Sequence, residues 1–345
     1  MLTRCDIFPT MTWTKLIVAL AFLGLAAAVV PPTVNLGKDV NGKPVDMPLV
    51  GAGTWQYNDS VAYDSVCKAF GAGYNMVDTA HGYGNEKGVG QAIQDCWFGA
   101  GKAREDLFVM TKLEGGLNTS EVLTAHAENM EWLQLDYVDH LMSHFPADWY
   151  ETPERSTPER RQEEWLALES VYNTGAARSI GISHYCSQHI DDVMEVATVK
   201  PSVNQVEYHV GSGDIDDVIA KCAEEEIYFM SFSPLCGPCT YKPTDSLIDG
   251  DLVTSIAANY SHADGSAVAG SQIALRWIVQ QALPDAPGYA PFVAGVIPKS
   301  DTLSHIESNA DLFDFELSRE DMERLSAAKK PRATGGDCSV SVPKA

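Results

Sequence analysis

From residue 48 onward, short apolar runs alternate with longer amphipathic stretches along the chain. The apolar runs are rich in Val, Ile, Met and Phe, and we predict them to be strands at residues 49–54, 75–79, 107–111, 137–143, 179–182, 202–206, 227–232 and 295–298. Apolar positions at helical spacing predict helices between them, at residues 64–72, 87–98, 120–133, 159–173, 187–197, 215–225 and 271–281. Near-continuous apolar strands that alternate with helices are typical of a buried parallel sheet.

Eight such strand–helix units favour an α/β fold of the closed (β/α)₈ TIM barrel type, with an open doubly wound sheet as the alternative. No Gly-x-Gly-x-x-Gly motif follows a strand, which counts against a Rossmann half. Residues 33–46 contain Asn41-Gly42 between two short extended runs, and this pattern predicts a β-hairpin at the closed bottom of the barrel. Because no repeat or low-complexity linker divides this region, we expect one barrel domain at residues 31–330 and a tail at 331–345.

The N-terminus carries a separate hydrophobic segment. Arg4 and Lys15 precede an uncharged apolar run at residues 16–30, which is short for a membrane span, and Ala26-Ala27-Ala28 resembles a signal-peptidase site. Residues 1–30 therefore predict a signal peptide, or an uncleaved signal anchor, and a secretory or secreted protein. An organellar leader or a misassigned start codon, with a cytoplasmic or organellar protein, is the alternative. Three Asn-x-Ser sequons, at Asn58, Asn118 and Asn259, add weak support for the secretory route.

Charge and cysteine usage limit the kinds of partner. The chain has 24 Lys and Arg against 47 Asp and Glu, a net charge of -23, which argues against a nucleic-acid or anionic membrane surface. An anionic ligand would need a local basic pocket. The eight cysteines are scattered and do not have the spacing of a disulfide framework. We expect a small-molecule substrate, no obligate protein partner and a monomer.

Polar residues gather where the predicted strands end. In a (β/α)₈ barrel the active site lies at the C-terminal ends of the strands. Nearly every predicted strand is followed there by a residue able to bind or catalyse: Thr54, Trp55, Asp78, Thr79, Lys112, His144, Ser183, His184, Glu207, His209, Ser233, Lys299 and Ser300. This convergence favours an enzyme over a purely structural protein.

Three of these residues, Asp78, Lys112 and His144, form a proton-transfer set together with Tyr83. Tyr83 has an ordinary pKa near 10, which is high for an acid at neutral pH. We expect a buried Lys112 beside it to lower that pKa, and Asp78 to hold Lys112 charged and in place. His144 could exchange a second hydrogen bond with a carbonyl oxygen. The set suits protonation of an oxygen as hydride reaches the adjacent carbon.

At this point the chain resembles the aldo-keto reductase family over roughly residues 33–330. The resemblance rests on collinear motifs: GAGTW at 51–55, DTAHGYGNEKGVG at 78–90, Lys112, DYVD at 136–139 followed by His144 and Pro146, GIS at 181–183, NQVEYH at 204–209, SPL at 233–235, IPKS at 297–300, Asn309 and FDFEL at 313–317. It implies an NAD(P)H-dependent enzyme that reduces aldehydes or ketones to alcohols, an oxidoreductase acting on CH–OH groups. In that reaction Tyr83 would supply the proton, Lys112 and Asp78 would tune it, and His144 would orient the substrate.

The resemblance also implies how cofactor and substrate are bound. Ser183 and Gln205 would hold the nicotinamide carboxamide, and Thr54 and Asp78 would lie along the ribose. The remaining cofactor positions are Ser233 and Leu235 along the pyrophosphate, Lys299 and Ser300 at the adenosine 2′-phosphate, and Asn309 in the closing segment. Trp55, His144 and Phe145 would line the substrate pocket.

Three cofactor positions depart from the family pattern. His184 replaces the usual Asn, Phe232 replaces the Tyr that stacks on the nicotinamide, and His305 replaces an Arg that clamps the phosphate. Arg binds phosphate through two hydrogen bonds and is always charged, and His has neither property. The retained Lys299 and Ser300 favour NADPH, with NADH as the alternative.

Competing signals predict other functions. Cys236-Gly237-Pro238-Cys239 has the thioredoxin tetrapeptide pattern but follows a late strand of a long barrel, so we expect ordinary loop cysteines. A non-catalytic cofactor-binding subunit, or a redox sensor using the Cys236/Cys239 pair, is the alternative function. Glu114, after Lys112, is either an exposed loop acid or part of a polar pocket mouth. We expect no metal among His140, His144 and His209, because no acidic ligands accompany them, and His209 to be a core or strand-end histidine.

Overall fold

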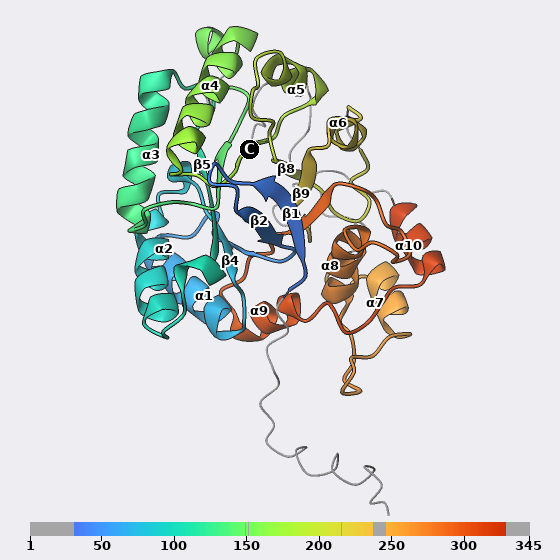
Figure 1. Ribbon diagram of the computed structural model, residues 1–345. Helices are drawn as coiled ribbons and strands as arrows, with labels where there is room; N and C mark the ends of the chain where they lie inside the picture. Colours follow the sequence, from blue (N-terminus) through green and yellow to red (C-terminus); the bar gives the residue numbers. More distant parts are fainter. Residues whose placement is uncertain (1–30, 149, 151, 215, 237–245, 329–345) are drawn as a thin grey trace, which may run out of the picture.

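The computed structural model describes residues 31–328, except residues 149, 151, 215 and 237–245 (Figure 1). The predicted signal segment at 1–30, the tail at 331–345 and Cys239 therefore lie outside the described residues. Within the part that is described, no helix combines the length and the apolar character needed to cross a membrane.

The centre of the molecule is a barrel of parallel strands. Eight strands follow one another in chain order around a single sheet: β3 (Ala52–Gly53), β4 (Met76–Asp78), β5 (Phe108–Leu113), β6 (His140–Ser143), β7 (Ile180–Ser183), β8 (Val203–Glu207), β9 (Tyr228–Phe232) and β10 (Val293–Val296). A parallel bridge between Val50 and Val296 joins the two ends of this sheet. The predicted (β/α)₈ barrel is thus confirmed, and the open sheet is excluded.

Closure of the barrel depends on a glycine in the last strand. Gly295 has φ +111°, and a Cβ added there would collide with the backbone carbonyl of Leu49. The missing side chain lets β10 approach the segment before β3, where Val296 N donates to Leu49 O at 2.9 Å and Gly51 N donates to Val296 O at 3.0 Å. This strand was predicted at 295–298 and lies two residues earlier.

Helices surround the strands (Figure 1). They are α1 (Asp59–Gly71), α2 (Glu86–Ala92), α3 (Thr119–Leu133), α4 (Pro158–Thr174), α5 (Ser187–Met194), α6 (Val218–Glu224), α7 (Asp251–Ala257), α8 (Gly270–Gln281), α9 (Leu303–Ala310) and α10 (Arg319–Ser326). The seven predicted helices are present, whereas α7, α9 and α10 were not predicted. The prediction of one α-helix at 87–98 was wrong in part, since the π-helical turn η2 (Ile93–Phe98) continues α2.

The predicted hairpin lies at the N-terminal end of the barrel. Strands β1 (Thr33–Lys38) and β2 (Pro44–Pro48) pair antiparallel, and Gly42 takes a left-handed φ of +76° in the turn. Arg178, two residues before β7, donates from Nη2 to Pro44 O at 2.7 Å. Because this contact is at the N-terminal ends of the strands, the hairpin covers the face opposite the expected active site.

A disulfide joins α1 to the π-helical turn η2 that continues α2. Cys67 and Cys96 are 29 residues apart in sequence, with Cα atoms 5.4 Å from each other. Cys186 and Cys236 are also disulfide-bonded, and Cys222 is buried and free. The scattered spacing of the cysteines had not predicted this pairing. The spacing along the chain carried no signal of pairing, because only the packing of α1 against α2 brings the two thiols together.

Candidate active site

A buried ion pair forms the base of the site. Asp78 ends β4 and Lys112 lies in the adjacent strand β5, and both are almost completely buried. Lys112 Nζ donates to Asp78 Oδ1 at 2.7 Å, to Asp78 Oδ2 at 2.6 Å and to the carbonyl of Thr79 at 2.9 Å. Burial lowers the pKa of Lys112, and Asp78 opposes this shift. The carboxylate therefore holds the ammonium group in place, as predicted.

Tyr83 lies directly above this pair. It ends the 3₁₀ helix η1 (His81–Tyr83), which follows β4, and its hydroxyl is 3.4 Å from Lys112 Nζ. The loop is held by buried Asn85, whose Nδ2 donates to the carbonyl of Thr54 at 2.8 Å and whose Oδ1 accepts from Thr79 at 3.0 Å. The sequence motif included Asn85, but its role as an anchor of this loop was not predicted.

The pKa of Tyr83 differs from the prediction. Burial and the negative charge of Asp78 raise it well above its ordinary value, whereas we expected Lys112 to lower it. Both carboxylate oxygens of Asp78 contact Lys112 Nζ more closely than the Tyr83 hydroxyl does, so much of the ammonium charge is compensated. Tyr83 is thus held in its protonated form, as a hydrogen-bond donor.

His144 completes the predicted group of four. It follows β6, and its ring centroid is 5.4 Å from that of Tyr83, in an edge-on arrangement. Burial, Lys112 and His184 lower the pKa of His144 well below its ordinary value. The imidazole is therefore neutral, with one N–H group able to donate. Among the described residues, no side chain or backbone group makes a hydrogen bond to it.

A row of rings runs from His144 toward the expected cofactor position. Phe145 stacks on His144 with centroids 4.3 Å apart, and His184 lies 4.5 Å from Phe145 and 4.7 Å from Phe232. These contacts bring two predicted cofactor residues, His184 and Phe232, together with the predicted substrate residue Phe145. The fifth and seventh strands of the barrel, β7 and β9, thus contribute to one continuous wall.

His184 has its hydrogen bonds within the protein. Its Nδ1 is 3.1 Å from the carbonyl of His144 and 3.0 Å from Ser183 Oγ. Ser183 Oγ itself donates to the carbonyl of Gln205 at 2.8 Å, so His184 Nδ1 carries the proton and donates. Burial lowers the pKa of His184 to about 4. This neutral ring leaves Nε2 as an acceptor, which differs from the amide of the usual Asn.

Two other predicted cofactor residues contact Asp78 directly. Gln205 Nε2 donates to Asp78 Oδ2 at 3.0 Å, and Thr54 Oγ1 donates to the backbone carbonyl of Asp78 at 2.9 Å. Both side chains are buried. They therefore help to position the ion pair, a role that sequence reasoning did not assign to them.

The predicted phosphate-binding residues lie near the surface. Lys299 is exposed, donates from Nζ to Gln56 Oε1 at 3.1 Å and lies 4.8 Å from the ring centroid of Tyr57. Ser300 is half-buried, and His305 is exposed on α9. Asn309, four residues after His305 and so on the same side of that helix, is buried.

The remaining predicted residues are Trp55, Ser233, Leu235 and the cysteine pair. Trp55 is 41 % exposed after β3, so its indole faces solvent. Ser233 has a left-handed φ of +48°, and half-buried Leu235 packs against the hydrophobic core. Cys236 is disulfide-bonded, contrary to the expectation of an ordinary loop thiol, and Cys239 lies outside the described residues.

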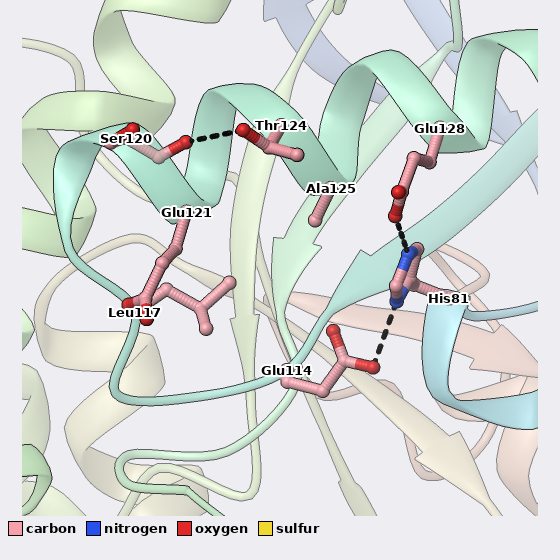
Figure 2. Close-up of a pocket in the computed structure, with 8 residues that line it drawn as sticks. All are labelled: His81, Glu114, Leu117, Ser120, Glu121, Thr124, Ala125 and Glu128. Atoms are coloured by element: carbon pink, nitrogen blue, oxygen red, sulfur yellow. Dashed lines mark hydrogen bonds and ion pairs between the residues drawn. The ribbon is translucent and has the colours of Figure 1, made fainter.

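A second polar group lies beside the site, around His81. Its Nδ1 is 2.8 Å from Glu114 and its Nε2 is 2.8 Å from Glu128 of α3, which gives His81 a carboxylate on each side (Figure 2). The hydrogen bond to Glu114 raises the pKa of His81 to about 9, although burial opposes this. Glu114 is therefore a hydrogen-bond partner of His81 rather than a free loop acid.

These residues line a pocket of about 290 Å³ between the end of β5 and α3. Its lining residues are His81, Glu114, Leu117, Ser120, Glu121, Thr124, Ala125 and Glu128 (Figure 2). None of the four residues of the proton-transfer set belongs to it. The sequence carried no sign of this cluster, because its members come from three separate segments.

His140 and His209, two histidines considered above as metal ligands, occupy structural positions. His140 is buried in β6 with Nδ1 2.7 Å from Ser179 Oγ, and burial lowers its pKa to about 3. His209 is buried after β8, with Nδ1 3.0 Å from the carbonyl of Val210, so the predicted core position is confirmed.

The chain is also similar in sequence to known proteins. A family model described as the Aldo/keto reductase family matches residues 49–330. The chain is 34% identical over 295 residues to the uncharacterized oxidoreductase YtbE of Bacillus subtilis, covering 85% of this chain and 93% of that protein. It is also 34% identical over 297 residues to the glyoxal reductase of Bacillus subtilis, covering 84% and 92%.

A solved structure has the same fold. An aldo-keto reductase from Bombyx mori in complex with NADP superposes with a TM-score of 0.71 at 28% sequence identity, covering 87% of this chain and 93% of that chain. The family model covers most of the chain, and the two Bacillus subtilis relatives cover 85% and 84% of it. The protein belongs to the aldo/keto reductase family.

Proposed function

We propose that the protein is an NAD(P)H-dependent reductase of aldehyde or ketone groups and that Tyr83 donates the proton. The observation that carries the proposal is the Tyr83 hydroxyl, 3.4 Å from Lys112 Nζ, above the buried Asp78–Lys112 pair and edge-on to a neutral His144. Tyr83 is the acid, Lys112 the cation and His144 the neutral hydrogen-bond donor. Three such groups close together suit a carbonyl oxygen, which gains negative charge when hydride reaches the carbon.

Each side chain then has a defined task. His144 donates a hydrogen bond that orients the carbonyl oxygen of the substrate. Tyr83 passes its proton to that oxygen, and the Lys112 ammonium stabilises the phenolate that remains. Asp78 keeps Lys112 charged at a depth where burial alone favours the neutral amine. A bound reduced nicotinamide supplies the hydride for the carbon atom, so that carbonyl, hydride and proton together give the alcohol.

The residues present fit such a cofactor. Asn309 is 6% exposed and lies on α9 one turn after the exposed His305. His305 on the same side of α9 and the exposed cation of Lys299 would face the adenosine end, while Ser183, His184 and Phe232 would hold the nicotinamide. We propose NADPH as the preferred form, because Lys299 can pair with a phosphate.

The direct test follows absorbance at 340 nm with the purified protein. Glyoxal, methylglyoxal, simple aldehydes, aldoses and ketones are each supplied with NADPH or NADH. Consumption of reduced cofactor that depends on the carbonyl compound, with formation of the matching alcohol, is the expected result. Tight cofactor binding without turnover of any of them would contradict the proposal and favour the non-catalytic cofactor-binding subunit.

We further propose that the chain enters the secretory pathway and acts as a monomer. The Cys67–Cys96 disulfide supports the first point, because stable disulfides are typical of oxidising compartments. Exposed Asn259, in a sequon after α7, is available to a glycan. Expression of the full chain in eukaryotic cells, with glycosidase digestion and N-terminal sequencing, tests the route.

Light scattering tests the monomer, which is expected because one chain supplies all four central residues.

A further inference from the structure

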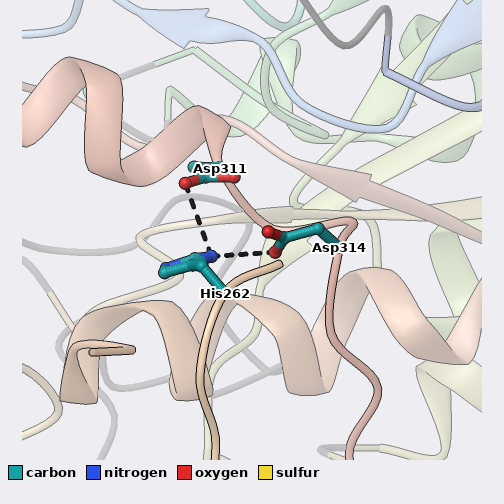
Figure 3. Close-up of side chains that lie close together, drawn as sticks. All are labelled: His262, Asp311 and Asp314. Carbon is teal, nitrogen blue, oxygen red and sulfur yellow. Dashed lines mark hydrogen bonds and ion pairs between the residues drawn. The ribbon is translucent and has the colours of Figure 1, made fainter. Parts of the chain in front are cut away.

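A compact group of metal-ligating side chains lies away from the active site. His262, in the loop between α7 and α8, faces Asp311 and Asp314, which follow α9 (Figure 3). His262 Nδ1 is 2.8 Å from Asp314 Oδ1 and 3.4 Å from Asp311 Oδ2, and one ligand atom from each residue lies within 4.8 Å of the other two. The histidine is 7% exposed, whereas the Asp311 side chain is 53% exposed.

A neighbouring amide determines which ring nitrogen of His262 carries a proton. Gln272 Nε2 donates to the carbonyls of Ser308 and Asp311, at 3.1 and 2.8 Å, and its Oε1 accepts from Ala269 N at 2.8 Å. These three bonds orient the amide so that Oε1 faces His262 Nε2, 3.2 Å away. His262 Nε2 must therefore be the donor.

This orientation leaves Nδ1 with two carboxylates and no donor. In the neutral imidazole the lone pair of Nδ1 faces one oxygen from each aspartate, an arrangement of three acceptors around one point. The other oxygen of Asp314 already accepts from Ala263 N at 2.8 Å, which holds that carboxylate in place. The central point must be filled by a positive charge, either a second proton on His262 or a metal cation.

We propose that His262, Asp311 and Asp314 form a binding site for Zn²⁺ or a divalent metal ion of similar ligand preference. One imidazole nitrogen and two carboxylate oxygens are ligands of the kind that Zn²⁺ prefers, with water completing four-coordination. Bonds of about 2 Å in a tetrahedral site place ligand atoms about 3.3 Å apart. The 3.4 Å separation from Asp311 already fits this value, and the shorter one from Asp314 needs to open by about 0.5 Å.

The surroundings favour a cation at this point. Asp264 adds a further negative charge near Asp311, whereas buried Arg276, on which the charge of Asp314 acts, donates to Gln280 Oε1 and to the carbonyl of Leu312. Access is open on the Asp311 side. A bound ion would tie the loop before α8 to the segment after α9, the helix that carries His305 and Asn309. The inference is independent of the proposed reductase activity.

The test measures metal binding directly on the purified, metal-free full-length protein. Isothermal titration with Zn²⁺ and a thermal-unfolding scan compare the natural protein with Asp311→Asn, His262→Gln and Glu323→Gln. Asp311 is exposed, so its replacement is compatible with folding. Glu323 is an exposed acid of α10 outside the group and serves as the matched control. Co²⁺ substitution followed by absorbance distinguishes nitrogen and oxygen ligands from thiolates.

We expect one Zn²⁺ per chain and a higher unfolding temperature in its presence. Affinity should fall at least tenfold in Asp311→Asn and His262→Gln and stay unchanged in Glu323→Gln, and the Co²⁺ spectrum should lack a thiolate band. Binding that survives Asp311→Asn, a thiolate signature, or no binding at micromolar Zn²⁺ would each overturn the proposal. If no Zn²⁺ binds, a second proton on His262 occupies the position between Nδ1 and the two carboxylates.

Discussion

Two buried ion-pair networks lie at opposite ends of the barrel and differ in how completely they are satisfied. At the N-terminal end, Asp139 accepts from Arg104 Nη2 at 2.8 Å, from Arg178 Nη1 at 2.8 Å and from Val109 N at 2.9 Å. Arg178 continues to the hairpin through Pro44. All these bonds end on groups of the protein itself, and among the nitrogens of the two arginines only the buried Nε of Arg104 has no partner within the described residues.

At the C-terminal end the corresponding pair is Asp78–Lys112. The polar groups next to this pair have few or no hydrogen bonds within the described residues. Tyr83 receives one long hydrogen bond from Lys112, and within the described residues the imidazole of His144 has no hydrogen-bond partner. The difference separates a structural network from a functional one. Charges that are fully paired within the fold contribute to stability, whereas polar groups held by the fold but left unpaired are available to a ligand.

The largest expected effect comes from Lys112→Met, which removes one partner of the most deeply buried pair. It leaves Asp78 as an unpaired buried charge, so we expect a loss of about 3–5 kcal/mol in the free energy of unfolding, together with loss of reductase activity. Urea denaturation measures the first. In the control Asp78→Asn/Lys112→Met the charge is removed, and part of the stability should return. Equal stability of the single and double variants would contradict this account.

Tyr83→Phe should separate function from stability. It removes the hydroxyl that Lys112 approaches but keeps the ring, so we expect kcat to fall at least about 100-fold, which corresponds to about 2.7 kcal/mol in the barrier. The free energy of unfolding should change little, because the hydroxyl makes one weak hydrogen bond. Steady-state rates with NADPH and urea denaturation give the two values. Near-normal turnover would exclude Tyr83 as the proton donor.

Asp139→Asn should have the opposite profile. The charge between Arg104 and Arg178 is lost while the side-chain shape is kept, so we expect the free energy of unfolding to fall by about 2 kcal/mol. The effect is smaller than that of Lys112→Met because both arginines are partly exposed and can be solvated. We expect kcat to stay within about twofold of the natural value. A loss of activity as large as that of Tyr83→Phe would show that the two ends are coupled.

The smallest effect concerns His81 and depends on pH. Its pKa is raised to about 9 in the folded protein, above the unfolded value, so its contribution to stability is fully present below pH 6.5 and disappears as the pH rises through about 9. His81→Gln should therefore lower the free energy of unfolding at pH 6 by up to about 1 kcal/mol, since both glutamates are partly exposed, and have no such effect at pH 10. A difference independent of pH would indicate lost packing against Trp132 instead.

The barrel and the group of four were predictable because their signals are local. Near-continuous apolar strands mark a parallel sheet, and a polar residue directly after a strand lies at the active end of a barrel. Asp78, Lys112 and His144 each follow or end such a run, and Tyr83 belongs to the motif that begins with Asp78. Their convergence therefore required only the fold class.

Other features depend on contacts between distant segments. The Cys67–Cys96 disulfide, the carboxylates around His81 and the group at His262 each join segments whose separation in sequence carries no pattern. The direction of the Tyr83 pKa shift was mispredicted for a similar reason. It follows from burial and from distances to Asp78 and Lys112, which the order of residues does not specify.

The sequence by itself determined the fold class, the order of strands and helices and the residue types at the active end, because periodicity and motif spacing are properties of neighbouring residues. Only the tertiary structure decided which of those residues have their hydrogen bonds satisfied within the protein and which do not. Thr54, Gln205 and His184 all donate to groups around Asp78 and His144, whereas the imidazole of His144 has no hydrogen-bond partner among the described residues. The physical reason is that burial and hydrogen-bond partners are set by packing across the whole barrel.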